Sequence, residues 1–329
     1  MNDALKKRCE QFVGNYLIMR KSFKWETVLL LPLVSMLYVN EGKNIDPGYI
    51  NYCKAIIKKN AGLFSSFRSR TFIVAAAMLS LADNPEIFFE NVQNAYKELK
   101  DKRFYGSDYL ALSALFMARE CDPSRYGEIA SKARDLYDEM KRNHPFLTFS
   151  SDYTYAVMLA MSGLDTSKVM AEAENCYYRL KIRFRSSDAV QSLSHILAIG
   201  EEPAGDKCSR VISLYDELKS RKNRFSVRYG LSALGVISLI TGDIVKAADD
   251  IIEVSEYLKG QKGFGVFSIS KDQRLMLAAG LVSDDYVDAM RKSLMSLTLM
   301  NSITSIIIAQ QTAVICAATS ACAASAASN

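Results

Sequence analysis

Histidine is scarce in this sequence, and its scarcity limits the chemistry that the chain can perform. There are two histidines: His144 precedes Pro145 in an expected loop, and His195 lies within a helical pattern. Histidine is the commonest metal ligand and general acid or base. No set of His, Cys, Asp and Glu has the spacing of a metal site, and no glycine-rich loop follows a strand pattern. The sequence therefore contains no catalytic motif, and it predicts no metal and no cofactor.

Closely spaced cysteine pairs are also lacking. The seven cysteines are scattered, and no two of them have the spacing of a zinc site or a redox motif. Reduced, buried thiols are usual in the cytoplasm. Residues 1–8 lead into an amphipathic helix with charges throughout, which is not the pattern of a signal peptide. We therefore expect a cytoplasmic protein.

Proline and glycine are few, with six and sixteen residues in a chain of 329. Such a composition leaves little room for linkers, so we predict a single helical-repeat domain over residues 1–329. The 41 basic and 36 acidic residues give a net charge of +5. This balance is too even to predict a nucleic-acid partner.

A short pattern of tyrosine, leucine and lysine is what the sequence does contain, and it recurs about every 40 residues. A phenylalanine follows each copy. The tyrosines are Tyr96, Tyr137, Tyr177, Tyr215 and, in a weaker copy, Tyr257; the phenylalanines are Phe104, Phe146, Phe184, Phe225 and Phe264. A period near 40 that is filled with helical patterning is typical of stacked helix pairs.

Helix start signals support the same repeat independently. Asp46-Pro47, Asn84-Pro85 and Asp122-Pro123 are equally spaced. An Asx side chain caps the free amides of the first turn, and proline is tolerated at the first helical position. We name two helices in each repeat: A helices are short and apolar nearly all round, whereas B helices are longer and amphipathic.

These patterns predict an all-α fold, an α-solenoid of about seven antiparallel helix pairs with a period of about 40 residues. Residues 1–24 are expected to form an N-terminal cap helix with no counterpart in the repeat, and residues 25–292 the repeats. We expect Pro32 to bend a helix over residues 25–39. The last A helix is expected over residues 270–279, with a separate B helix from residue 284 onward.

The last part of the chain, residues 293–329, has no charged side chain. We expect it to form an apolar C-terminal helix followed by an Ala/Ser tail. Residues 294–313 are long enough to span a bilayer, but they contain Asn301, Gln310 and Gln311 and have no aromatic belt or basic flank. A buried closing helix is the preferred interpretation, and a membrane anchor and a partner-binding helix are the alternatives.

Arginine or lysine occurs in each turn from a B helix to an A helix. If the repeats stack in register, these charges line one edge of the solenoid and could bind an acidic peptide, a phosphorylated ligand or a nucleic-acid backbone. The alternative is that cations simply favour helix C-termini, where each contributes about 0.3–1 kcal/mol. The candidate ligand-binding residues are Arg68, Arg70, Tyr109, Tyr153, Arg185 and Arg228.

Several segments resemble an uncharacterised bacterial all-helical family, domain-of-unknown-function family four thousand and three. They are the turn Phe67-Arg-Ser-Arg70, the run at residues 76–81 followed by Asn84-Pro85, Tyr96-Lys-Glu-Leu-Lys100 and residues 104–110. The resemblance covers nearly the whole chain. It implies no activity, no cofactor and no site residue.

The leading functional hypothesis is a non-enzymatic scaffold that binds a protein or peptide, with an acidic one as a candidate, in a concave groove. One alternative is an enzyme on a closed α/α toroid of the carbohydrate-active type, which would need two converging carboxylates. The other is a membrane-associated protein anchored by residues 294–313. The oligomeric state is left open by the sequence.

Overall fold

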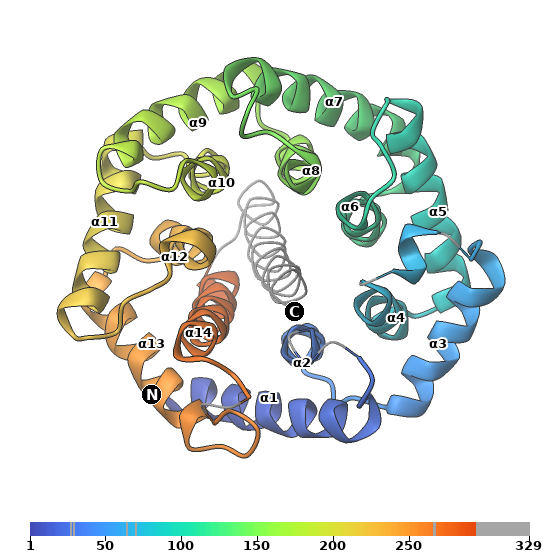
Figure 1. Ribbon diagram of the computed structural model, residues 1–329, viewed down its shortest axis with the longest axis horizontal. Helices are drawn as coiled ribbons and strands as arrows, with labels where there is room; N and C mark the ends of the chain where they lie inside the picture. Colours follow the sequence, from blue (N-terminus) through green and yellow to red (C-terminus); the bar gives the residue numbers. More distant parts are fainter. Residues whose placement is uncertain (27, 29, 64, 70, 266–267, 294–329) are drawn as a thin grey trace, which may run out of the picture. The chain divides into compact units, whose positions relative to one another are not determined.

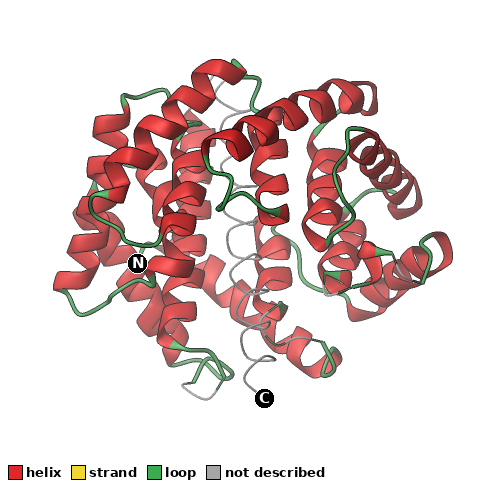
Figure 2. Ribbon diagram, turned by 45° about the horizontal axis from the view of Figure 1, so that its top comes forward, coloured by secondary structure: helices red, strands yellow, loops and turns green. Residues whose placement is uncertain are grey.

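The architecture is helical throughout the part of the chain that the structure describes. The structure is a computed structural model, and it describes all residues except 27, 29, 64, 70, 266–267 and 294–329. These described residues form fourteen α-helices and three short 3-10 helices, and they contain no strand (Figures 1 and 2). The predicted all-α class is confirmed. The contacts divide the chain into two units: unit 2 is Ile18–Thr166, and unit 1 combines Met1–Leu17 with the part that follows Ser167.

Unit 2 consists of alternating long and short helices. Neighbours along the chain pair as α3 with α4, α5 with α6 and α7 with α8, and the long helices α3, α5 and α7 also contact one another in sequence. The short helices α2, α4, α6 and α8 do the same, and α4, α6 and α8 are seen end-on in Figure 1. The helices are α2 Leu31–Asn40, α3 Pro47–Asn60, η1 Ser66–Arg68, α4 Phe72–Leu81, α5 Pro85–Asp101, α6 Asp108–Glu120, η2 Pro123–Arg125, α7 Tyr126–Asn143, η3 Ser150–Asp152 and α8 Tyr153–Met161.

Unit 1 follows the same alternation. Helix α11 contacts α12, helix α13 contacts α14, and the A helices α10, α12 and α14 contact one another in sequence. Its helices are the first part of α1 Asp3–Ser22, then α9 Thr166–Lys181, α10 Ser187–Leu197, α11 Ala204–Ser220, α12 Val227–Ile240, α13 Ile244–Lys259 and α14 Lys271–Ser293.

The A helices of unit 2 are buried along their whole length. Every side chain in residues 73–80 of α4, 110–118 of α6 and 153–160 of α8 is buried. Their uncharged sequences are the reason, because a helix without a polar face is stable only when other elements cover it on all sides. The B helix α5 instead buries one stripe, formed by Phe89, Val92, Ala95 and Leu99.

The Asx-Pro start signals act as the sequence predicts. The carboxylate of Asp46 accepts hydrogen bonds from the amides of Gly48 and Tyr49 at the start of α3. The side chain of Asn84 accepts one from Ile87 at the start of α5, and Asp122 one from Ser124 at the start of η2. These bonds satisfy first-turn amides that have no partner within the helix.

The recurring tyrosines have recurring partners. In three cases the tyrosine of a B helix packs against the phenylalanine of the turn that follows the preceding B helix. The ring centroids are 5.1 Å apart for Tyr96 and Phe67, 5.7 Å for Tyr137 and Phe104, and 5.1 Å for Tyr215 and Phe184. Such aromatic pairs contribute stability beyond the area that they bury.

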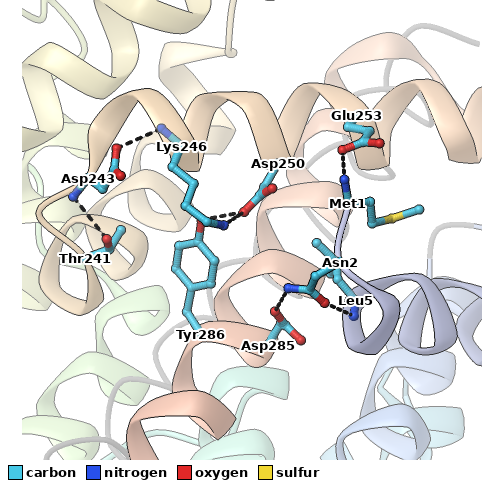
Figure 3. A network of polar contacts seen from close by, with 10 residues as sticks. All are labelled: Met1, Asn2, Leu5, Thr241, Asp243, Lys246, Asp250, Glu253, Asp285 and Tyr286. Carbon is cyan, nitrogen blue, oxygen red and sulfur yellow. Dashed lines mark hydrogen bonds and ion pairs between the residues drawn. The ribbon is translucent and has the colours of Figure 1, made fainter.

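Helix α1 makes the same contact with the last described helix pair. In unit 1 the ring of Phe264, from the turn between α13 and α14, lies 4.6 Å from Tyr16 and 5.7 Å from Phe12. Asn2 donates a hydrogen bond to Asp285 at 3.2 Å (Figure 3), and Arg8 forms an ion pair with Asp288. This aromatic contact is of the kind that the B helices make, and the N-terminal cap over residues 1–24 stays a prediction.

Two predicted helix boundaries are also wrong. Helix α2 begins at Leu31, so Pro32 lies in its first turn, where its missing amide needs no partner, and bends nothing. Helix α14 is one continuous helix from Lys271 to Ser293, with no break before residue 284. Burial of Leu281 and Val282 outweighs the low helix propensity of Gly280. The predicted C-terminal helix, residues 293–329, lies almost wholly outside the described residues, and the single domain stays a prediction.

A glycine permits the close approach of α10 and α12. A Cβ atom at Gly235 would lie 2.4 Å from Cδ1 of the buried Leu193. We expect Gly235→Ala to lower the free energy of unfolding by about 1–3 kcal/mol through overpacking. At Gly14, within α1, a Cβ atom would meet no other atom within 4 Å, so Gly14→Ala should raise it by about 0.5–1 kcal/mol. Urea denaturation measures the free energy of unfolding of both variants. If both substitutions changed it in the same direction, the close approach at Gly235 would not explain the effect.

Candidate functional site

The turns from B to A helices in unit 2 lie at one edge. Lys54 of α3 pairs with Glu26 in the turn before α2, and its ammonium lies 4.9 Å from the ring of Phe72 at the start of α4. Further contacts join Ser69 to Asp108 and Phe104 to Tyr153, at a ring distance of 4.8 Å. We name the described residues of 23–30, 61–71, 102–107 and 144–152 the turn edge of unit 2.

Each of these four turns exposes a large apolar side chain. The exposed fraction is 100% for Trp25, 69% for Leu63, 77% for Tyr105 and 88% for Phe146. A single exposed apolar residue is common, but a series on one edge is typical of an interaction surface. Tryptophan, tyrosine and arginine are also the residues most enriched among those that dominate binding energy.

Exposed cations stand beside these apolar residues. Lys24 precedes Trp25, Arg103 precedes the turn residue Tyr105 closely, and Arg142 precedes Phe146. All three are exposed, and the described residues give none of them an ion pair. The turn edge therefore offers positive charge for a partner.

Other cations of this edge are used within the fold. The ammonium of Lys141 donates to the carbonyl oxygens of Pro145 and Thr148, both at 2.7 Å, and so holds the turn before α8. Arg134 donates through Nε to Asp138 at 2.9 Å and through Nη1 to the carbonyl oxygen of Arg103 at 3.2 Å. Lys141, in the last turn of α7, fits the alternative that cations at helix ends serve the turns themselves, and Arg134 supports a turn from the middle of α7.

Three of the predicted site residues lie together on or next to the turn edge. Arg68 is half-buried in η1, with Nη1 3.5 Å from the carbonyl oxygen of Ala61. Tyr109 is half-buried in the first turn of α6. Tyr153 is buried, and its hydroxyl accepts a hydrogen bond from the amide of Tyr105 at 3.5 Å. Tyr153 therefore holds one turn against the next.

The structure does not place the other three predicted residues with this group. Arg185 is exposed in unit 1, in the turn between α9 and α10. Arg70 lies outside the described residues, and Arg228 lies in α12 with a side chain that is not described. Trp25, Tyr105 and Phe146 were missed. Their closeness along the chain to Lys24, Arg103 and Arg142 is a signal in the sequence, but the sequence does not show whether an apolar side chain in a turn is buried or exposed.

A shallow pocket lies at the opposite ends of the A helices of unit 2. It has a volume of about 250 Å³, and Met78, Phe88, Asp83, Glu41 and Arg119 are among its lining residues. Arg119 donates to Glu41 at 2.6 Å, so these two lining charges neutralise each other. None of the predicted site residues lines this pocket.

A polar network joins α13 to α14 and to the amino-terminal residues (Figure 3). Asp250 accepts from Lys246 at 2.5 Å and from the hydroxyl of Tyr286 at 2.6 Å. Burial, and then this hydrogen bond, raise the pKa of Tyr286 above its usual range, so the phenol stays a donor. The network fastens the last described helix pair together.

The described part of the chain offers neither a metal site nor a membrane span. There, no group of three or more His, Cys, Asp and Glu side chains could hold a metal ion. No helix in the same residues combines the length and apolar character that a membrane span requires. The predicted anchor segment, residues 294–313, lies outside them.

The fold defines an all-helical protein, and the comparisons place it in a family. Residues 15–312 match the model of DUF4003, described as a protein of unknown function, and the chain belongs to this family. It is similar to YeaA, an uncharacterized protein of Bacillus subtilis strain 168, with 24% identity over 332 residues that cover 98% of this chain and 97% of YeaA. No solved structure matches the chain. The family resemblance drawn from the sequence is confirmed.

Proposed function

We propose that this protein is a non-enzymatic, cytoplasmic helical-repeat scaffold that binds a protein or peptide with acidic segments. Its repeats would form a solenoid of about seven helix pairs with a period of about 40 residues. The observation that carries the proposal is the turn edge of unit 2, where each of the four turns exposes a large apolar side chain and three of these residues have an exposed cation close by in the sequence.

The turn edge is a better binding surface than the groove expected from the sequence. Residues 73–80, 110–118 and 153–160 are buried, so the faces of these A helices offer little to a partner. The turns at their N-terminal ends are exposed instead. Apolar anchors supply most of the binding energy in protein interfaces, whereas rim charges steer association and select partners. An acidic segment with apolar side chains would match both the exposed apolar residues and the exposed cations of the turn edge.

The backbone at Arg103 supports a role for its side chain. Its φ is 67°, in the left-handed region that favours glycine. A non-glycine residue there costs roughly 1–2 kcal/mol, and it follows the C-terminus of α5, where glycine is usual. Arg103 is nevertheless exposed and without an ion pair among the described residues. An arginine whose side chain has no ion pair among the described residues is well placed to serve a partner.

Site-specific photo-crosslinking in living cells tests the proposal. A photoreactive phenylalanine analogue replaces Tyr105, which is 77% exposed on the turn edge, or in the control Tyr49, which is 38% exposed on α3. A protein captured from position 105 and not from position 49 supports the proposal. Exposed cations beside apolar side chains also suit anionic membranes and single-stranded nucleic acids. Capture of lipid or nucleic acid alone at position 105 therefore contradicts the proposal. Equal capture at both positions, or none, contradicts it too.

The three aromatic anchors should act on binding and not on stability. We expect the variant with Trp25→Ala, Tyr105→Ala and Phe146→Ala to bind the captured partner at least about 100-fold more weakly. Each substitution should change the free energy of unfolding by less than about 0.5 kcal/mol, because the side chains are exposed. Titration monitored by the fluorescence of Trp25, the single tryptophan, measures the affinity of the parent chain, and calorimetry that of the variant. Unchanged affinity would exclude the turn edge.

Arg103 should show a trade-off between stability and binding. Arg103→Gly is expected to raise the free energy of unfolding by about 1 kcal/mol, since glycine adopts this backbone conformation without strain. It should also weaken partner binding and reduce its dependence on salt, because one cation is lost. Lys222 also has a positive φ, 61°, and lies in unit 1. The matched control Lys222→Gly should gain stability and leave binding unchanged; weaker binding in both variants would contradict a specific role for Arg103.

A further inference from the structure

Two cysteine side chains from different B helices meet in unit 1. Cys176 lies on α9 and Cys208 on α11, and both are buried free thiols. The thiol of Cys208 donates to the carbonyl oxygen of Cys176 over 3.8 Å, and the two thiol groups are themselves within hydrogen-bond reach. The two residues are far apart in sequence, and the fold brings their sulfur atoms together.

Charged groups of both signs surround this pair, and the carboxylate of Glu172 opposes the effect of the two cations. Lys207, next to Cys208, is fully buried, and its ammonium lies 2.7 Å from both Glu172 Oε1 and the carbonyl oxygen of Gly200. Arg179, one turn after Cys176, is exposed, and its charge acts on Cys208. A cation beside a thiol favours the thiolate, which is the reactive form of cysteine.

The two thiols are consequently unequal. The hydrogen bond from Cys176 lowers the pKa of Cys208, and the charges of Lys207 and Arg179 lower it further against the effect of burial. The same hydrogen bond, together with burial, raises the pKa of Cys176. Burial alone dominates elsewhere: it raises the pKa of Cys9 and Cys53 to about 12 each. Cys208 is thus suited to act as the nucleophile, with Cys176 as its neighbouring proton donor.

We propose that Cys176 and Cys208 form a dithiol that reacts with small hydroperoxides and closes into a disulfide between α9 and α11. The Cys208 thiolate attacks one peroxide oxygen: an S–O bond forms, the O–O bond breaks, and the leaving hydroxide takes a proton to become water. Cys176 then attacks the sulfur of the Cys208 sulfenic acid, so that the S–S bond forms, the S–O bond breaks and a second water leaves. The two thiols lose two electrons, and hydrogen peroxide gains them.

The burial of the pair determines which oxidants can reach it. Cys208 is 3% exposed, whereas Glu172 is partly exposed and Arg179 is exposed. We expect local opening of the surrounding side chains to admit a molecule of the size of hydrogen peroxide and to exclude a bulky aromatic disulfide reagent. Cys208 should therefore react faster with hydrogen peroxide than with bulky aromatic disulfides. An exposed thiol shows the opposite order of rates.

Mass spectrometry of the full chain tests the proposal. The reduced protein is treated with hydrogen peroxide near neutral pH, alkylated with N-ethylmaleimide and digested without reductant. We expect one linked peptide pair that contains Cys176 and Cys208, lighter by two hydrogens and restored by dithiothreitol. With the alkylation carried out in denaturant, Cys53 should be found fully alkylated, since its pKa of about 12 in the folded chain keeps it protonated and unreactive toward peroxide. A disulfide between any other pair, or full alkylation of both residues, would overturn the proposal.

Variants separate the roles of the two sulfur atoms. Cys208→Ser should abolish oxidation of Cys176, whereas Cys176→Ser should leave a sulfenic acid on Cys208 that a cyclic 1,3-dione traps. Serine is close in size to cysteine, so both variants should fold, and circular dichroism checks this. If the dione trapped a sulfenic acid on Cys176 in the Cys208→Ser variant, Cys176 would be the thiol that attacks peroxide, and the proposal would be overturned. Arg179→Ala should slow the oxidation several-fold at neutral pH; an unchanged rate would contradict activation by charge.

Discussion

Phe264→Ala is expected to lower the free energy of unfolding by about 4 kcal/mol, the range found when a buried phenylalanine ring is removed. Phe264 is fully buried, and its ring contacts Tyr16 at 4.6 Å and Phe12 at 5.7 Å. Truncation would leave a cavity between α1 and the turn that joins α13 to α14. Equilibrium denaturation in urea, followed by circular dichroism, measures the change.

The chain offers a matched control for this substitution. Phe146→Ala removes the same atoms from a side chain that is 88% exposed, so it should cost less than about 0.5 kcal/mol. A double-mutant cycle with Tyr16→Ala should give a coupling energy of about 1 kcal/mol or more between Tyr16 and Phe264. If Phe264→Ala were as mild as Phe146→Ala, helix α1 would not be docked on the last described helix pair.

Glu172→Ala is expected to be the second large destabilisation, of about 3 kcal/mol. Lys207 is fully buried, and Glu172 Oε1 lies 2.7 Å from its ammonium. Removal of the carboxylate leaves a buried positive charge whose one remaining partner among the described residues is the carbonyl oxygen of Gly200, also at 2.7 Å. By contrast, Lys207→Met removes the charge itself and fills much of the same volume, so it should cost less than about 1.5 kcal/mol.

An exposed ion pair provides the comparison. Arg183 and Asp216 pair across two elements of unit 1, with 35% and 47% of their side chains exposed. Asp216→Ala should cost no more than about 1 kcal/mol, as is usual for pairs in contact with water. The double variant Glu172→Ala with Lys207→Met should be more stable than Glu172→Ala alone. If Lys207→Met lowered the free energy of unfolding more than Glu172→Ala, the loss of stability would not come from the uncompensated charge of Lys207.

Much of the local architecture could be predicted from the sequence because its causes are local. The caps at Asp46 and Asn84 depend on amides two or three residues away, so the dipeptides alone were sufficient. The alternation of apolar and amphipathic helices follows from side chains within a single helix. The errors arose where packing competes with propensity: Gly280 did not end α14, because its neighbours Leu281 and Val282 are buried.

The turn edge and the neighbouring thiols were less accessible to sequence analysis. Arg68, Tyr109 and Tyr153 were singled out, but Tyr153 is a buried packing residue and the exposed anchors Trp25, Tyr105 and Phe146 were missed. Cys176 and Cys208 looked like two isolated buried thiols, since their spacing matches no motif. Exposure and sulfur–sulfur proximity depend on neighbours that are remote along the chain.

The amino-acid sequence by itself determined that the chain is helical, where most of its helices begin, and which recurring tyrosine and phenylalanine positions are available for packing. Hydrogen bonds within a turn and the 3.6-residue periodicity of apolar side chains are properties of neighbours, and a sequence displays them directly. Only the tertiary structure decided that Tyr16 packs on Phe264, that Trp25 and Phe146 remain in water, and that Cys176 meets Cys208. The free energy of each of these arrangements depends on contacts between segments that are far apart in the sequence.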